Sequence, residues 1–95
     1  GMYNQGGNPA LTNVTFTGND ARNGGGFYNA VGSPTLTDVF FINSSALNLD
    51  GNKANVDGGG MYIANGNPNL NRVNFYNNSA AGLGGGLYIA SGTPT

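Results

Sequence analysis

The sequence predicts an all-β fold, a β-solenoid of about four partial coils of roughly 25 residues each. The main observation is an internal repeat, which covers the whole chain. A second is that turn-forming residues interrupt the chain every few positions, since 18 of its 95 residues are glycine and 17 are asparagine. A third is that apolar residues between these breaks alternate as in strands, not with helical spacing.

The repeat pairs a glycine-apolar-tyrosine element with a proline and a Leu-x-x-Val-x-Phe segment. Pro9, Pro34, Pro68 and Pro94 are 25, 34 and 26 residues apart, so the second copy contains an insertion at 47–57. We therefore expect one β-helical segment, 1–95, divided into the units 1–23, 24–57, 58–83 and 84–95.

Within each unit, the leucine precedes the valine by three positions, not by the two that a straight strand would require. This spacing predicts a corner of the coil near Thr12-Asn13, Thr37-Asp38 and Asn71-Arg72. Each coil would then contain two or three short strands, and successive coils would stack in parallel about 4.8 Å apart.

Stacking places equivalent residues of successive coils above one another, which predicts columns of like side chains. Four interior columns are expected: Leu11, Leu36 and Leu70; Val14, Val39 and Val73; Phe16, Phe41 and Phe75; and Met2, Phe27, Met61 and Leu87. The alternation favours an outward column of Tyr3, Tyr28, Tyr62 and Tyr88, with the opposite orientation as the alternative.

Glycine and asparagine have predicted roles at the corners. Glycine triplets such as Gly24-Gly25-Gly26 suit a positive φ or a close approach of two coils. Asn19, Ser44 and Asn78 share one turn position, where we expect a left-handed conformation, and stacked asparagine amides would hydrogen-bond between coils.

Charge and composition exclude several functions. Only 7% of residues are charged and the net charge is -1, so the chain lacks the basic surface that nucleic acids or anionic membranes require. It contains no histidine and no cysteine, which removes the commonest general base and thiolate chemistry. No apolar run reaches the roughly 20 residues that span a bilayer, so we expect no membrane insertion by this segment.

The ionisable residues do not form a predicted active site. They are Asp20, Asp38, Asp50, Asp57, Arg22, Lys53 and Arg72, with the tyrosines as a further possibility. The aspartates do not share one repeat position, so we predict a chain that is not an enzyme and has no catalytic, cofactor-binding or metal-binding residues. Asp50-Gly51-Asn52 and Asp57 could offer oxygen ligands to Ca²⁺, but an ordinary turn is favoured over a calcium site.

Two motifs carry a resemblance to a known family. Phe16-Thr17-Gly18-Asn19 and Phe75-Tyr76-Asn77-Asn78, each followed by Gly-Gly-apolar, resemble the FxxN and GG(A/L/V/I) repeats of polymorphic outer-membrane proteins of bacterial autotransporter type. In the second unit, Phe41 is followed by Ser44 where the motif has asparagine, while Phe40 with Asn43 gives a match shifted by one residue. The resemblance implies a right-handed parallel β-helix in a surface or secreted passenger region, used in adhesion or as a stalk, and it brings no catalytic residue.

We therefore expect a non-catalytic extracellular structural or adhesive module. Its partners would be the rest of a longer β-helix, further copies stacked end to end in a fibre, or host and matrix glycans. An alternative is a carbohydrate-binding or polysaccharide-degrading segment whose site lies mostly outside this stretch; the tyrosines would either stack on sugars or pack against neighbouring coils. An ice-binding solenoid is the third hypothesis, but Thr35 and Thr37 correspond to Asn69 and Asn71, which breaks the threonine ladder.

Overall fold

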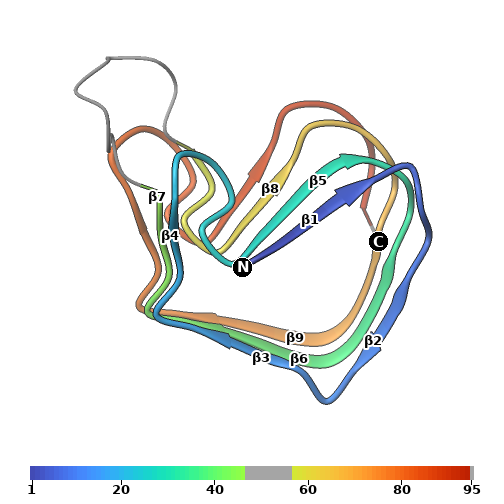
Figure 1. The fold of residues 1–95 in the computed structure, drawn as a ribbon, viewed down its shortest axis with the longest axis horizontal. Helices are drawn as coiled ribbons and strands as arrows, with labels where there is room; N and C mark the ends of the chain where they lie inside the picture. Colours follow the sequence, from blue (N-terminus) through green and yellow to red (C-terminus); the bar gives the residue numbers. More distant parts are fainter. Residues whose placement is uncertain (47–56, 95) are drawn as a thin grey trace.

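The structure, a computed structural model, describes residues 1–46 and 57–94. These residues form eleven strands and no helix, which confirms the all-β prediction. No membrane-spanning helix is therefore present in this part of the chain. The strands of successive repeats lie side by side in three parallel sheets (Figure 1). The insertion 47–57 lies outside the described residues except for Asp57.

The first sheet contains the glycine-tyrosine elements of all four repeats, in the order β1-β5-β8-β11. Its strands are β1 (Met2–Gln5), β5 (Phe27–Val31), β8 (Met61–Ile63) and β11 (Leu87–Ile89). Each pairs in parallel with the equivalent strand of the next repeat, so that the tyrosines are directly opposed. The sequence repeat is thus also a structural repeat.

The second sheet contains the leucine-valine-phenylalanine segments. Its strands are β2 (Ala10–Thr12), β3 (Thr15–Thr17), β6 (Thr35–Ile42) and β9 (Asn69–Tyr76). β6 lies centrally and pairs with the other three, which places Phe41 opposite Phe16 and Phe75. The same register places Thr37 opposite Asn71, so the threonine column ends at the third repeat, as predicted.

The corner between the leucine and the valine occurs where the spacing predicts it. Asn13, Asp38 and Arg72 adopt the left-handed conformation, with φ of 56°, 54° and 50°. This conformation reverses the inward-outward alternation locally, so both the leucine and the valine three positions later face the interior. The predicted corner is confirmed.

The third sheet is short and consists of β4 (Asp20–Ala21), β7 (Ser45–Ala46) and β10 (Ser79–Ala80). The turn before it corrects one prediction, because the left-handed residues are Gly18, Asn43 and Asn77. They precede the expected positions Asn19, Ser44 and Asn78 by one residue.

The physical reason for this shift is visible at Asn78, whose side chain takes part in hydrogen bonds between repeats. The backbone nitrogen of Ser44 donates to Asn78 Oδ1 at 3.0 Å, and Asn78 Nδ2 donates to the Phe41 carbonyl at 2.8 Å. The preceding exposed residue makes the reversal instead. Asn78 bonds to the backbone of the neighbouring repeat, and not to another stacked amide as predicted.

The core consists of the predicted columns together with Ile63, which was not predicted. Six apolar side chains are fully buried: Phe27, Leu36, Val39, Phe41, Met61 and Ile63. The outer members of the columns pack against them, namely Met2, Leu11, Val14, Phe16, Leu70, Val73, Phe75 and Leu87. Phe41 stacks on Phe16 and on Phe75, with ring centroids 5.0 Å apart in both pairs. The interior therefore continues through the three repeats as one apolar stack.

Both predicted uses of the glycine triplets are confirmed. The first glycine of each triplet, such as Gly58 with φ of 66°, has the left-handed conformation that glycine adopts at little cost. The third provides room for the core, since a Cβ at Gly60 would lie 2.6 Å from the Gly86 oxygen and 2.9 Å from Phe75 Cδ1. Glycine at this position thus allows the backbone of the next repeat and the ring of Phe75 to approach closely.

A buried asparagine pair was not predicted. Asn4 and Asn29 are 7% and 0% exposed, and Asn4 Nδ2 donates to Asn29 Oδ1 at 2.8 Å. Asn29 Nδ2 donates to the carbonyls of Gly32 and Asn65, both at 2.9 Å. In the third repeat the residue paired with Asn29 is Ile63, whose side chain cannot hydrogen-bond. The column of asparagine side chains therefore ends at Asn29.

Candidate functional site

The aspartates that the structure describes lie in different parts of the repeats. In the described ranges, no three acidic residues gather in a group that could hold a metal ion. Asp20 lies exposed in β4, Asp38 at the corner of β6, and Asp57 before the second glycine triplet. Asp50 and Lys53 lie outside the described residues.

Asp38 and Arg72 form an exposed ion pair across two repeats. Arg72 Nε lies 2.5 Å from Asp38 Oδ1, and Nη2 lies 3.1 Å from Oδ2, so the guanidinium binds the carboxylate with two parallel hydrogen bonds. The hydrogen bond from Arg72, aided by its charge, lowers the pKa of Asp38. The predicted corner already placed the two residues at equivalent positions, but the pairing itself was missed. Its geometry suits attachment of one coil to the next.

Asp57 is 3% exposed, and its polar groups are occupied by neighbouring repeats. Its carboxylate accepts a hydrogen bond from the Leu83 backbone nitrogen at 2.6 Å. Its own backbone nitrogen donates to Asn23 Oδ1 at 3.0 Å. The side chains of Asn23 and Asp57 thus each accept a hydrogen bond from a backbone nitrogen of the next repeat. The Asp57 carboxylate therefore has a structural role.

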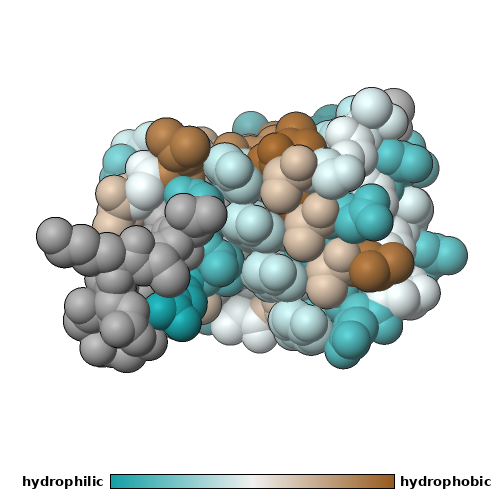
Figure 2. Space-filling view, turned by 90° about the horizontal axis from the view of Figure 1, so that it is seen from above, coloured by the Kyte–Doolittle hydropathy of each residue, from teal (hydrophilic) through white to brown (hydrophobic). Residues whose placement is uncertain are grey.

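The tyrosines form a continuous stack along the outer side of the first sheet. The ring centroids of Tyr3 and Tyr28 are 5.2 Å apart, those of Tyr28 and Tyr62 are 4.9 Å apart, and those of Tyr62 and Tyr88 are 5.2 Å apart. The outward orientation is confirmed, as is packing against neighbouring repeats. Figure 2, seen from this side, shows a row of pale side chains across the middle of the molecule.

Stacking determines what the tyrosines can offer to a ligand. Tyr28 and Tyr62 have neighbours on both ring faces, so they present ring edges and hydroxyl groups. Partial burial, followed by the effects of Tyr28, Tyr88 and Asp57, raises the pKa of Tyr62. Tyr3, at one end of the stack, is 61% exposed and is therefore the better candidate for contact with another molecule.

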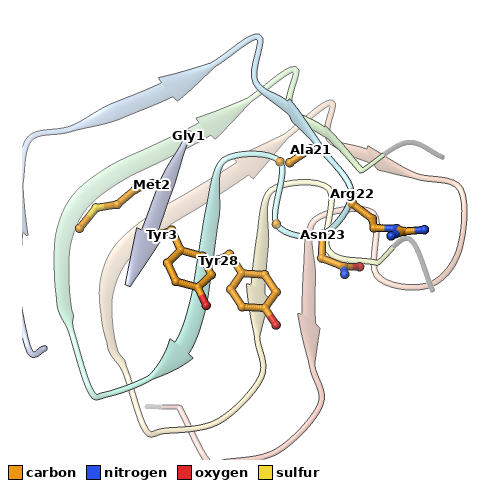
Figure 3. A pocket seen from close by; sticks show the side chains of 9 residues that line it. Gly1, Met2, Tyr3, Ala21, Arg22, Asn23 and Tyr28 are labelled. Carbon is orange, nitrogen blue, oxygen red and sulfur yellow. The ribbon is translucent and has the colours of Figure 1, made fainter. Parts of the chain in front are cut away.

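A hollow of about 370 Å³ opens beside this end of the stack. Tyr3 and Tyr28 line one side, and the segment of Ala21, Arg22 and Asn23 lines the other (Figure 3). The backbone of Gly24 and Gly25 completes the wall. The tyrosine rings thus face the segment 21–25 across this space, while the Arg22 guanidinium points away from the rings (Figure 3). This hollow is the candidate binding site of the described chain.

A second exposed group lies on the outer side of the second sheet. Phe40 is 42% exposed and Tyr76 is 65% exposed, while Ile42 is half-buried. Ile42 is directly opposite Tyr76 in the pairing of β6 with β9. Tyr76 lies on the second sheet and so is not part of the tyrosine stack, which runs along the first sheet.

The comparisons with known proteins agree with one part of the resemblance. The family model of the Chlamydia polymorphic membrane protein repeat matches residues 72–90. This stretch contains Phe75 and Asn78 of the FxxN motif and the triplet Gly84-Gly85-Gly86 with Leu87. A repeat of this type is therefore supported for the third unit and the start of the fourth. No curated protein and no solved structure matches the chain.

Proposed function

We propose that the chain is a right-handed parallel β-helix and serves as a non-catalytic structural or adhesive module at the bacterial surface. The register of the sheets is the observation that carries this proposal. Each described strand pairs in parallel with the equivalent strand of a neighbouring repeat, and like residues are opposed in all three sheets. The match to a polymorphic membrane protein repeat supports the surface location.

The mechanism of such a module is mechanical. Backbone hydrogen bonds run along the stack, as from Gly26 to Gly60 and from Gly60 to Gly86, both at 2.9 Å. Polar side chains add further bonds: Ser33 N donates to Asn8 Oδ1 at 2.7 Å, and Thr93 N to Asn67 Oδ1 at 2.8 Å. A pulling force along the stack would load many such bonds together, which suits a stalk.

Further repeats of a longer surface protein, or a second copy of the chain, would be the principal partners. The apolar columns end in half-buried side chains on both outer repeats, such as Phe16 on one and Phe75 on the other. A further coil would cover these rings and pair the outer strand edges, in the way that each described repeat covers the next.

Sedimentation and electron microscopy of the purified chain test the proposed association. We expect particles that lengthen with concentration and an assembly that Phe75→Asp weakens at least tenfold, because a charge would end the apolar column. Tyr76→Asp, on the same strand but outward, is the control and should assemble normally. Monomers at every concentration, together with no binding to cells or matrix, would refute the proposed module.

Carbohydrate binding is a second candidate, favoured by the hollow beside Tyr3. Sugars bind to sites that combine an aromatic surface with a few polar groups, and the exposed ring of Tyr3 with Asn23 across the hollow offers this combination. Screening against immobilised glycans should then show binding that Tyr3→Ala removes and Tyr76→Ala retains. Equal loss in both variants, or no binding at all, would rule out this site.

A further inference from the structure

The chain contains two asparagine-glycine pairs, Asn23-Gly24 and Asn65-Gly66. In such a pair, the backbone nitrogen of the glycine can attack the side-chain amide carbon of the asparagine, because glycine has no Cβ to hinder the approach. The reaction requires a glycine nitrogen that is close to this carbon and not held in a sheet. The two pairs differ in both respects.

Asn65-Gly66 meets both requirements. The Gly66 nitrogen donates to Oδ1 of Asn65 at 2.8 Å, and no bond from it to a neighbouring strand occurs in the described structure. Because Oδ1 is bonded to Cγ, this contact holds the nitrogen next to the carbon that it would attack. Asn65 is exposed, so water and hydroxide reach it. By contrast, the nitrogen of Gly6, in the corresponding turn of the first repeat, donates to the Val31 carbonyl at 2.8 Å.

Asn23-Gly24 meets neither requirement. The Gly24 nitrogen donates to the Asp57 carbonyl at 3.2 Å, and Gly24 is buried. Asn23 Oδ1 accepts a hydrogen bond from the Asp57 backbone nitrogen at 3.0 Å, which fixes the side chain toward the next repeat. Bonds between repeats thus hold the glycine nitrogen and the asparagine side chain of Asn23-Gly24, whereas in Asn65-Gly66 the same two groups hydrogen-bond to each other.

We propose that Asn65 is a site of self-modification, at which the folded chain converts asparagine to aspartate and isoaspartate through a cyclic imide. Hydroxide removes the proton from the Gly66 nitrogen, which bonds to Asn65 Cγ. The Cγ–Nδ2 bond breaks, and the nitrogen leaves as ammonia after taking up a proton. Water then adds to one of the two imide carbonyls and opens the ring.

The site lies where the modification would alter the stack. The Asn65 carbonyl accepts the hydrogen bond from buried Asn29 Nδ2, and the adjacent Gly66 packs tightly on the backbone of Gly32. Isoaspartate adds one carbon to the backbone at this turn, so it would displace the bond from Asn29. Either product also adds a negative charge to a chain whose net charge is -1. Conversion would therefore loosen contacts between the second and third repeats.

Peptide mapping by mass spectrometry tests the proposal on the purified chain. During incubation at mildly alkaline pH, we expect Asn65 to convert about tenfold or more faster than Asn23, because proximity favours only Asn65. In urea-unfolded protein, the two rates should agree within about twofold, since the local geometry that separates them is lost.

Three results would overturn the proposal: similar rates in the folded protein, faster conversion of Asn23, or a preference for Asn65 that persists in urea. Asn65→Gln serves as the matched variant, because its longer side chain must close a larger ring. It should retain the melting temperature and lose the conversion at position 65. Ammonia release that continues undiminished in Asn65→Gln would equally contradict the assignment.

Discussion

Phe40 and Phe41 are adjacent in β6 yet occupy opposite environments. Phe41 is fully buried between Phe16 and Phe75, whereas Phe40 is 42% exposed on the outer side of the sheet. The difference follows from strand alternation once the corner at Asp38 has set the phase. The same substitution at Phe40 and at Phe41 therefore tests side-chain orientation, because the residue type is identical and the positions are adjacent in the chain.

Phe41→Asp should reduce the free energy of unfolding by more than about 4 kcal/mol, because a charge would enter the apolar column. Phe40→Asp should change it by no more than about 1 kcal/mol, since the side chain reaches water. Urea unfolding followed by circular dichroism measures both. Equal losses in the two variants would contradict the assigned orientation of β6.

Ser44 is the one departure from the asparagine column, and its hydroxyl has no hydrogen-bond partner although it is buried. Asn78, one repeat further on, donates to the carbonyl of Phe41. An asparagine at 44 would reach the carbonyl of Phe16 in the same way. We expect Ser44→Asn to stabilise the chain by about 1 kcal/mol and Ser44→Ala to be nearly neutral. A loss of stability in Ser44→Asn, measured by urea titration, would show that the column has no room for it.

The Asp38–Arg72 pair predicts a small dependence of stability on acid. Its hydrogen bond lowers the folded-state pKa of Asp38 below the ordinary value of 3.8. The pair's contribution is therefore fully present above the unfolded pKa and is lost as pH falls through the lower folded value. Since both groups are exposed, the effect is small.

Urea midpoints of the wild-type chain and Asp38→Asn should thus differ slightly at neutral pH. The two midpoints should converge as the pH falls from about 3.8 through the lower folded-state pKa of Asp38, where the carboxylate of the folded wild type becomes protonated. Arg72→Gln should behave like Asp38→Asn, because it removes the partner. A difference that stays constant through this range would show that the pair does not contribute.

At the scale of the elements, some glycines are required by close packing, whereas others only lie in turns. A Cβ at Gly60 would meet the Gly86 oxygen at 2.6 Å and the ring of Phe75, and the backbone oxygen cannot move aside. At Gly7, the nearest atom is a side-chain oxygen of Asn4 at 3.3 Å. The two glycines therefore have different functions in the same repeat architecture.

Gly60→Ala should cost about 2 to 3 kcal/mol, as overpacking does elsewhere. Gly7→Ala should lie within about 1 kcal/mol of the parent, because its backbone conformation is open to alanine. Thermal unfolding of the two variants provides the comparison. A Gly60→Ala variant as stable as Gly7→Ala would show that Gly60 is not so closely packed against Gly86 and Phe75.

The sequence predicts much of the structure of the elements, because like residues that recur at a fixed period show which positions of successive repeats are equivalent. The leucine, valine, phenylalanine and tyrosine columns and the corner near Asp38 all follow from spacing. The Asn4–Asn29 pair does not follow from spacing, since asparagine is usual in turns and its burial depends on partners elsewhere in the chain. The left-handed residue before Ser44 and Asn78 was also missed, because neighbouring asparagines fit that conformation equally well in sequence.

The candidate site was less predictable for a related reason. The unequal repeat positions of the aspartates predict that they do not share one column, and the described Asp20, Asp38 and Asp57 lie in different parts of the repeats. The ion pair of Asp38 with Arg72 required the register of adjacent repeats, and the hollow beside Tyr3 required the path of the segment 21–25. Both depend on distances between repeats, which cannot be predicted from the spacing of residues along the chain.

At the scale of the whole molecule, stability depends on contacts between repeats more than on any single strand. The strands of the first sheet are three to five residues long, so none would persist without its neighbours. Low charge is consistent with this arrangement, because a like charge repeated in a column would repel its copy about 4.8 Å away. The repeats are therefore expected to unfold together.

The central claim is that equivalent residues of successive repeats lie directly above one another. Nuclear Overhauser contacts in the folded chain test it most directly. We predict contacts between the rings of Tyr28 and Tyr62 and between those of Phe41 and Phe75, although each pair is 34 residues apart in sequence. Absence of these contacts in a folded chain, or contacts displaced by one or more residues, would contradict the account.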